Sequence, residues 1–425
     1  MSRVSAGANL DKSRRPRRCG GGALLVTRIH LPEAAAASFR LDGVERALAR
    51  HGVPVRVLTT TTPGREGAPA PVPDDPEGVR VSRWPALRDA SGYLRGYLPY
   101  MSYDLPVALR LGTASRPDIV LVEPPPTTGV VVRAVCALRR LPYVWYAPDV
   151  WSDATASTGA SDIVVRVVRA IESWAVRGAV RVIAVNEGVA ERARAMGARD
   201  VVIVPNGVDT STFTPDGARP GSEERVAMGL TGPYFVYAGT ASEWQGAGVF
   251  VQALEKVRRT HPTAQILYLG QGSDWERIGD LARRLPVGPD GLPGVVMHGL
   301  LPAQEAARWQ RGAVASLVSI IPGQGYDFAY PTKVLAALAC GVPVVYAGVG
   351  PVVEDLTAHD LGWVADYTED DVARAMTRAL DEADQTAAQD SSRAHRLHAW
   401  VRDHRSLRAT GEAVARHLRT VVRGA

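Results

Sequence analysis

Short apolar runs alternate with longer amphipathic segments along most of the chain. The runs at 23–32 and 53–60 have the composition of buried strands. The segment 38–52 between them has the spacing of an amphipathic helix that ends at Gly52. Strands joined by helices form parallel sheets, so this region predicts a strand–helix–strand unit. The apolar face of the predicted helix consists of Phe39, Leu41, Val44 and Leu48.

The alternation pauses once and then resumes. The pause, at 209–232, is rich in Gly, Pro, Ser and Thr, which is typical of a linker. Two alternating runs on either side of it predict an α/β protein with two doubly wound, Rossmann-like domains that face each other across a cleft. The expected divisions are a disordered basic leader at 1–22, a first domain at 23–205, a linker at 206–232, a second domain at 233–385 and helices at 386–425 that pack back on the first domain.

The stretch YPTKVLAALACGVPVVYAGVG, residues 330–350, is the longest part of this pattern without a charge after Lys333. It is too interrupted by Gly and Pro to span a membrane. A helix that opens at Pro331 and ends at Gly341 in a left-handed C-cap fits better. The run from Pro343 to Tyr346 then reads as a strand buried on both faces. Helix, tight turn and buried strand therefore follow one another here.

Composition changes this picture little. The net charge of the 425 residues is +5, and residues 1–18 hold six basic residues and one acidic residue, which accounts for all of it. A neutral body gives little support to nucleic-acid binding. The start of the chain lacks the apolar region of a secretory signal, and the weaker alternative to a disordered leader is an electrostatic tether to anionic lipid. Cys19, Cys136 and Cys340 lack metal-ligand spacing and predict reduced thiols in the cytoplasm.

Several blocks, in a fixed order, resemble one enzyme family. VPNGVDTSTFTP at 204–215 resembles the Asn-Gly-Val-Asp-x-x-x-Phe junction signature of the family-four retaining glycosyltransferases, which are two-domain GT-B proteins. The other blocks are LPEAAAASFR at 31–40, YAGTASEWQG at 237–246, LGQGSDWERI at 269–278 and YPTKVLAALACGVPVV at 330–345, the last similar to the donor-site helix of a subgroup with Pro-Ser-Lys.

The resemblance implies transfer of a sugar from a nucleotide-diphosphate sugar, with retained anomeric configuration and without a metal or another cofactor. The first domain would hold a sugar, lipid-linked or small-molecule acceptor, and the second domain the donor. It also implies a protein of carbohydrate biosynthesis in the cytoplasm, with peripheral contact at the inner face of the membrane as an extension. No nucleic-acid partner is expected.

Three departures from the family pattern matter. The Glu that holds the donor ribose corresponds to Ala336, and its companion acid corresponds to Phe328, beside Asp327. The Arg and Lys that grip the diphosphate correspond to Thr240 and Gln245, although the Pro-Ser-Lys subgroup also lacks that pair. Because of Ala336, a non-catalytic relative that binds nucleotide sugars stays open, and a sugar-nucleotide epimerase is a third reading. We expect Asp327 to replace the missing Glu.

The expected chemistry centres on a diphosphate. A helix N-terminus at Thr332 and the charge of Lys333 suit a leaving diphosphate, whereas an ordinary surface lysine is the plain alternative. Gly239 and Gly246 would allow close backbone approach, or serve only as turn glycines. Arg40 would reach across the cleft, or lie on the surface. The substrate-binding residues expected are Arg40, Gly239, Thr240, Gln245, Gly246, Gly270, Tyr326, Asp327, Thr332, Lys333 and Val334.

Asp149, after a predicted strand, is the candidate catalytic acid or base, with capping of a helix as its alternative and Asp153 as its competitor. Asn206 and Asp209 are expected to set the junction turn. Glu354 is a further candidate for the nucleotide. The tyrosines at 93, 97, 100 and 103 have helical spacing and predict either core packing or a face for an acceptor or lipid headgroups. The nine histidines show no metal-binding pair.

Overall fold

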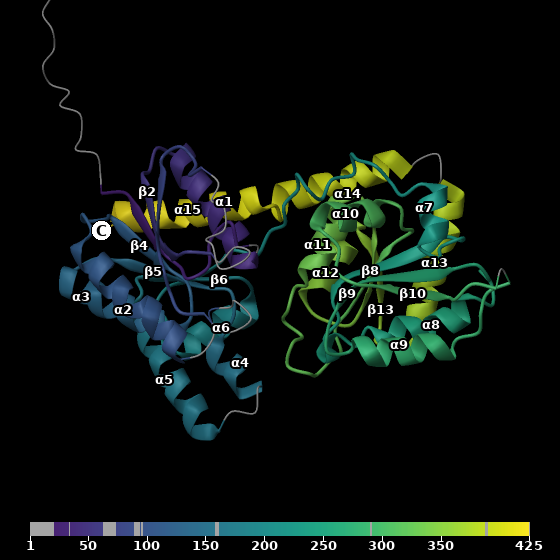
Figure 1. The fold of residues 1–425 in the computed structure, drawn as a ribbon, viewed down its shortest axis with the longest axis horizontal. Helices are drawn as coiled ribbons and strands as arrows, with labels where there is room; N and C mark the ends of the chain where they lie inside the picture. Colours follow the sequence, from purple (N-terminus) through teal and green to yellow (C-terminus); the bar gives the residue numbers. More distant parts are fainter. Residues whose placement is uncertain are drawn as a thin grey trace, which may run out of the picture.

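The computed structural model describes residues 21–424 except for 34, 63–73, 89–93, 95–96, 158–160, 290 and 387–389. Most of the basic leader and Tyr93 therefore lie outside the described residues. Two parallel sheets with helices on both faces form two domains (Figure 1). The predicted fold class, two Rossmann-like domains, is confirmed. No described helix is long and apolar enough to cross a membrane.

The first sheet has seven parallel strands in the order β3-β2-β1-β4-β5-β6-β7. β1 lies inside the sheet and pairs with β2 and β4, with Ala23 opposite both Val55 and Ile119. All four residues of β1 are buried, as expected for a strand covered on both faces. The strands are β1 Ala23–Val26, β2 Val55–Thr60, β3 Val79–Trp84, β4 Ile119–Val122, β5 Tyr143–Ala147, β6 Arg181–Ala184 and β7 Val201–Ile203.

The first predicted helix is present, with one error. Leu41, Val44 and Leu48 are buried in the core, but Phe39 is 43% exposed. At 100° per residue, Phe39 lies about 200° around the helix from Leu41, so it cannot share that face. The helices of this domain are α1 Ala36–Arg50, α2 Tyr97–Thr113, α3 Pro126–Arg139, α4 Trp151–Ser157, α5 Asp162–Gly178 and α6 Glu187–Ala195.

The second sheet has six parallel strands in the order β10-β9-β8-β11-β12-β13. Its strands are β8 Tyr234–Thr240, β9 Gln265–Gln271, β10 Val295–His298, β11 Ser316–Ser319, β12 Val344–Ala347 and β13 Gly362–Ala365. The helices are α7 Ser222–Ala227, inside the expected linker, the 3-10 turn η2 Glu243–Gln245, α8 Gly248–Val257, α9 Trp275–Arg284, α10 Ala303–Arg311, α11 Thr332–Ala339, α12 Pro351–His359 and α13 Glu369–Thr386.

The uncharged stretch 330–350 folds as the sequence predicts. α11 follows Pro331, and Gly341 adopts φ +76° just after the helix. β12 is buried along its whole length. The turn brings α11 beside the sheet with its N-terminus at the carboxyl ends of the strands, which is the edge where open α/β sheets bind ligands.

Of the last two helices, only the second returns to the first domain, so the expectation that all of 386–425 packs there is wrong for the first of them (Figure 1). α14 Asp390–His404 packs on α11, and α15 Leu407–Gly424 packs on α1. α15 approaches α1 closely, because a Cβ on Gly411 would lie 2.2 Å from the carbonyl oxygen of Gly43. Glu412 pairs with Arg50 and His51 at 2.8 Å each.

The two segments that cross between the domains are joined to each other. The Val208 N–H donates to the carbonyl oxygen of Arg405 (2.8 Å), and the Leu407 N–H donates to the carbonyl oxygen of Val208 (2.9 Å). Gly207 is required at this point, since a Cβ there would lie 2.4 Å from the Ser406 backbone. The domains are therefore connected by a short two-stranded bridge rather than by a single linker.

Candidate functional site

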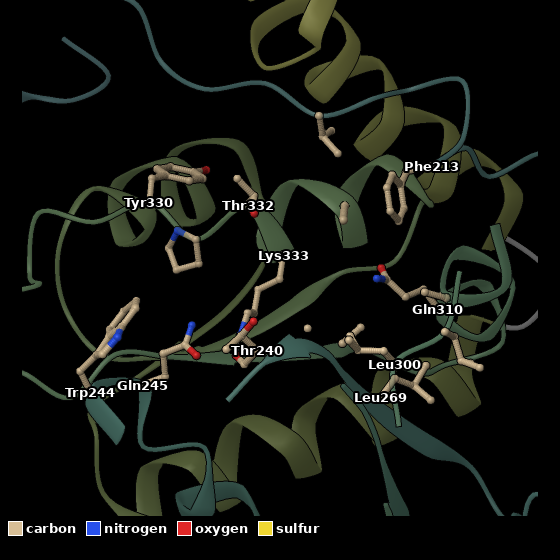
Figure 2. A pocket seen from close by; sticks show the side chains of 17 residues that line it. Phe213, Thr240, Trp244, Gln245, Leu269, Leu300, Gln310, Tyr330, Thr332 and Lys333 are labelled. Carbon is tan, nitrogen blue, oxygen red and sulfur yellow. Dashed lines mark hydrogen bonds between the residues drawn. The ribbon is translucent and has the colours of Figure 1, made fainter. Parts of the chain in front are cut away.

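A cavity of about 550 Å³ opens at the carboxyl ends of β8 and β9 in the second domain (Figure 2). It lies where the strand order reverses between β8 and β11, the position at which doubly wound sheets bind ligands. Its walls differ from end to end. Trp244 and Gln245 form one end, Thr240 and Lys333 lie in the middle, and the other end is apolar. The apolar end consists of Phe213, Leu269, Leu300, Leu301 and Ala306.

The N-terminus of α11 forms the middle of this cavity. No side chain caps the helix at Pro331, so the N–H groups of Thr332 and Lys333 are open to a ligand, whereas that of Val334 donates to the Pro331 carbonyl oxygen. Lys333 is half-buried there, and its Nζ donates to the Tyr237 hydroxyl at 2.6 Å and to the Thr240 carbonyl oxygen at 2.8 Å. Burial lowers the pKa of Lys333 to about 7. Among the described carboxylates, none forms an ion pair with Lys333, so its charge lacks a counter-ion.

The expected glycines divide into two groups. Gly239 lines the cavity at φ +122°, beside the Lys333 side chain. Gly246 and Gly270 are not on its wall: a Cβ on Gly246 would lie 2.0 Å from the Tyr367 hydroxyl, and one on Gly270 would lie 2.0 Å from the Gly239 carbonyl oxygen. Both are needed for packing. Val334 is fully buried, and its N–H donates to Pro331, so the expected contact is wrong for its side chain.

Thr240, Gln245 and Thr332 do line the cavity. Gln245 is already committed, because its Oε1 accepts from the Ser242 N–H (3.0 Å) and the Tyr237 hydroxyl (3.1 Å). Gln245 thus stabilises the turn after β8, and its side-chain oxygen is already occupied by protein donors. Tyr326 lies outside the cavity wall but stacks on Trp244, with ring centroids 4.4 Å apart. The aromatic pair closes the end of the cavity opposite the apolar walls.

The proposed substitute for the missing Glu is wrong. Ala336 lines the cavity, but Asp327 does not. The Asp327 carboxylate accepts from the Gly323 N–H at 3.0 and 3.2 Å and so closes its own loop. It faces a second cavity of about 680 Å³ that both domains line, together with Glu354 and Asn186. Glu354 therefore also lies away from the first cavity.

Phe328 lies in that second cavity and joins the domains. A Cβ on Gly188 of α6 would lie 2.4 Å from the Phe328 ring, and the Arg192 guanidinium lies 4.7 Å from the ring centroid. The position at which the family has an acidic residue is thus used here for an apolar contact between domains. This contact also shows that the carboxyl edge of the first sheet faces the second domain.

Arg40 is neither a surface residue nor free to cross the cleft, so both expectations are wrong. It is buried on α1, and its Nη2 lies 2.7 Å from Oε1 of Glu123, which follows β4. Its guanidinium also lies 5.1 Å from the Tyr146 ring centroid. Burial acts against the charge, but Glu123 outweighs it and raises the pKa of Arg40 above its ordinary value. This pair is part of the scaffold.

Asp149 follows β5 and is the uncommitted carboxylate of this edge. No described group donates a hydrogen bond to it, and its side chain is exposed. The protein around the carboxyl still removes enough water to raise the pKa of Asp149 to about 6, against the opposing charge of Arg40. The helix-capping alternative is wrong, because Glu172 accepts from the N–H groups of Trp151 and Ser152 at 2.9 Å each. Asp153 is paired with Arg192.

The tyrosine series of α2 belongs to the interior where it is described. Tyr103 is buried and donates to the carbonyl oxygens of Thr27 and Leu58. Tyr100 contacts Arg28, whose guanidinium lies 4.1 Å from the ring centroid. The core alternative, not the lipid face, fits these two residues. Asp209 accepts from Ser211 and Thr212 and sets the junction turn as expected.

Two polar residues of interest were absent from the sequence predictions. Arg28 is buried after β1, and its Nε and Nη1 have no partner. Gln310 of α10 is 2% exposed, lines the first cavity and has an unpartnered Oε1. No sequence pattern marks Gln310 as a binding residue. It stands between Trp309 and Arg311 in a helix with many charged residues, where a glutamine is expected to face the solvent. Within the described parts of the chain, no group of three His, Cys, Asp or Glu residues is placed to hold a metal ion.

Comparisons with known proteins agree with this architecture. Residues 41–212 match the model of Glycosyltransferase Family 4, and residues 232–382 match that of Glycosyl transferases group 1. A GDP-mannose-dependent alpha-(1-6)-phosphatidylinositol monomannoside mannosyltransferase of Mycolicibacterium smegmatis is 29% identical over 216 residues. That match covers 50% of this chain and 54% of the relative, so the chain spans about half the length of that protein.

Solved structures extend the likeness of fold to nearly the whole chain. Sucrose-phosphate synthase from Thermosynechococcus elongatus superposes with a TM-score of 0.66 at 16% identity, over 95% of this chain and 99% of that one. Anabaena HepE, solved in complex with UDP and glucose, gives a TM-score of 0.63 at 16% identity, over 94% and 99%. The two family models match the two domains in chain order, and the protein belongs to the family-four glycosyltransferases with the GT-B fold.

Proposed function

We propose that this protein transfers a hexose from a nucleotide-diphosphate sugar to an acceptor hydroxyl, with retention of the anomeric configuration and without a metal ion. The observation that carries the proposal is the uncompensated positive charge in the first cavity. Lys333 and the uncapped N-terminus of α11 meet there, half-buried, and none of the described carboxylates is paired with them. A diphosphate supplies the missing negative charge.

The two ends of the cavity then fit the two ends of the donor. The nucleoside lies against Leu269, Leu300 and Leu301, and the sugar lies toward Trp244 and the loop that holds Tyr326. As the sugar–phosphate bond breaks, negative charge grows on the diphosphate. Lys333 and the helix N-terminus stabilise that charge more strongly in the transition state than in the bound donor. Asp149, at the opposing edge of the first domain, orients or deprotonates the acceptor hydroxyl.

We infer the acceptor class and the base from the relative and the structural neighbour named above. One acts on a phosphatidylinositol mannoside and uses GDP-mannose, and another was solved with UDP and glucose. We therefore propose either a lipid-linked or a soluble sugar-like acceptor, and either guanine or uracil as the base. A cytoplasmic site of action fits a soluble nucleotide-sugar donor.

We place the membrane contact of the proposed function on α5. The first turns of this helix extend from the lower end of the first domain and are exposed on most sides (Figure 1). Ile163, Val164 and Val167 are 66%, 47% and 55% exposed, with Arg166 and Arg169 on the same segment. Apolar side chains flanked by arginines are typical of helices that lie in an anionic bilayer surface.

The binding test uses the full chain and a panel of nucleoside diphosphates. Calorimetry with UDP, GDP and ADP identifies the base, and slow hydrolysis of the matching sugar donor then shows turnover. Proton NMR of the first product gives the anomeric configuration. Binding without turnover, with every acceptor tried, would instead support the non-catalytic relative that Ala336 suggests. Free-sugar epimerisation would support an epimerase.

The membrane test is separate. Co-sedimentation with vesicles of anionic phosphatidylglycerol, compared with neutral phosphatidylcholine, should show binding that Val167→Asp abolishes. Val167 is exposed, so this substitution should leave the unfolding midpoint unchanged. Equal sedimentation of both proteins would remove α5 from the contact, and a change from dimer to monomer in Val167→Asp would identify a second copy as its partner.

A further inference from the structure

Gln310 is a buried polar side chain of the first cavity whose oxygen lacks a hydrogen-bond partner. It lies near the C-terminus of α10, is 2% exposed, and its Oε1 meets no donor. Leaving a buried amide oxygen unpaired costs free energy comparable to a lost hydrogen bond. Figure 2 shows the Gln310 amide directed into the cavity, between Phe213 and Leu300. The amide therefore brings an oxygen without a partner to the wall of the cavity.

Ala336 lines the same cavity and sets the position of that ligand. Lys333 and Ala336 are three residues apart on α11, so they share a face and differ by about one helical turn, roughly 5 Å along the axis. In a nucleoside diphosphate the ribose is the group bonded directly to the phosphates. With the diphosphate at Lys333, the ribose lies one turn along, over Ala336.

The methyl group of Ala336 cannot form a hydrogen bond with a ribose. It does leave open the volume that a longer side chain at 336 would fill. Gln310, on α10, lines the same cavity as Ala336 (Figure 2). Its neighbours Phe213, Leu269 and Leu300 are apolar, so they offer no competing acceptor.

We propose that Gln310 is the ribose-recognition residue of this protein, and that its amide oxygen accepts a hydrogen bond from a ribose hydroxyl over Ala336. The inference rests on the proposed nucleotide-sugar function and goes beyond it by naming a specificity-determining residue. Recognition by a neutral amide differs from recognition by a carboxylate. The preference for ribose is modest and does not depend on a charge at this position.

The experiment compares ribonucleotides with their 2′,3′-dideoxy counterparts on the full chain. Wild-type protein should bind UDP or GDP, whichever its base site accepts, about tenfold more tightly than the dideoxy form. Gln310→Met has a similar length and no amide. It should reduce this ratio to less than about twofold by weakening the ribonucleotide alone. Gln310→Glu keeps an acceptor oxygen and should keep the preference.

Leu300→Ala is the matched control in the same cavity. It removes an apolar contact to the nucleoside and should weaken both nucleotides by the same factor, leaving the ratio at about ten. Unchanged affinity of Gln310→Met for the dideoxy nucleotide shows that the variant is folded. A wild-type ratio near one, or a tenfold ratio that survives in Gln310→Met, would overturn the proposal. Absence of binding for every nucleoside diphosphate would overturn the proposed function itself, and this inference with it.

Discussion

Lys333 in the second domain and Arg40 in the first occupy comparable places, each near the carboxyl edge of its sheet, but their electrostatic states are opposite. Arg40 is buried against Glu123 at 2.7 Å, and its pKa lies above the ordinary value. Lys333 donates to a hydroxyl and a carbonyl oxygen and lies 4.1 Å from the Tyr237 ring centroid, but none of the described carboxylates pairs with it, and burial lowers its pKa to about 7. The paired charge holds the fold together. The unpaired charge is free to bind an anion.

Asp149 extends the comparison within the first domain. It lies close enough to the Arg40–Glu123 pair for both charges to affect its pKa, yet none of the described donors binds it. A carboxyl with a pKa near 6 can exchange a proton at neutral pH, whereas one held in a strong ion pair cannot. In both domains, then, the candidates for chemistry are charged groups that form no ion pair with any of the described residues.

The largest expected effect is a loss of stability when the buried Arg40–Glu123 ion pair is broken. Glu123→Ala leaves the buried Arg40 charge unpaired and should lower the free energy of unfolding by about 3–5 kcal/mol. Urea denaturation followed by circular dichroism measures this. The double variant Arg40→Met, Glu123→Leu removes both charges and should recover most of the loss. A cost below about 1 kcal/mol for Glu123→Ala would mean that Arg40 does not depend on Glu123, and would return it to the list of ligand-binding residues.

The second prediction concerns Asp149. Asp149→Asn should lower kcat about 100-fold or more, while nucleoside diphosphate affinity stays within about twofold. Wild-type kcat should also fall as the pH drops below about 6, because the reactive carboxylate becomes protonated there. Asp153→Asn is the control, since Asp153 is already paired with Arg192. Equal losses in the two variants would assign the effect to the fold around α4 rather than to Asp149.

A smaller effect is expected on ligand binding at Lys333. Lys333→Ala should weaken nucleoside diphosphate binding by about 1.5–3 kcal/mol, the range for hydrogen bonds to charged groups. Binding of the nucleoside without phosphates should change little. Calorimetry with the nucleoside diphosphate and with the nucleoside separates the phosphate contribution to binding from that of the nucleoside. The surface variant Lys256→Ala is the control. Equal losses for nucleoside and diphosphate would rule out the phosphate contact.

The smallest effect is a pH dependence of that binding. The Lys333 amine of the free protein loses its proton as the pH rises through about 7, and a bound diphosphate raises its pKa. Above pH 7.5, binding must therefore take up a proton, and affinity should fall by up to about tenfold per pH unit. Calorimetry in two buffers of different ionisation enthalpy measures the uptake. Lys333→Met should make the affinity independent of pH in this range. A pH-independent affinity in the wild type would mean that the Lys333 amine is already fully charged in the free protein.

The parts that sequence predicted well are those governed by local pattern. The alternation of strands and helices predicted both Rossmann-like units, and Pro331 with Gly341 predicted the limits of α11. The N-terminus of α11 follows from that parse, so Lys333 could be found. Residues whose role depends on a distant partner could not be predicted in the same way. Glu123 is 83 residues from Arg40, and no local pattern links them.

Side-chain direction was the second limit. Asp327 and Ala336 are near in sequence, but the intervening loop turns Asp327 toward Gly323 and the interdomain cavity. Gln310 lies in a helix whose apolar face is narrow, and only the packed structure shows that its amide enters the cavity. Periodicity assigns a residue to a face of a helix, but it does not say what lies opposite that face.

The return of α15 to the first domain has a consequence for synthesis. Val414, Ala415 and Leu418 complete the same apolar core as Leu41 and Val44, although more than 360 residues separate them in the sequence. A ribosome makes the chain from its N-terminus, so α1 is made first and α15 last. The first domain must therefore wait, with the groove beside α1 uncovered, while the whole second domain is translated.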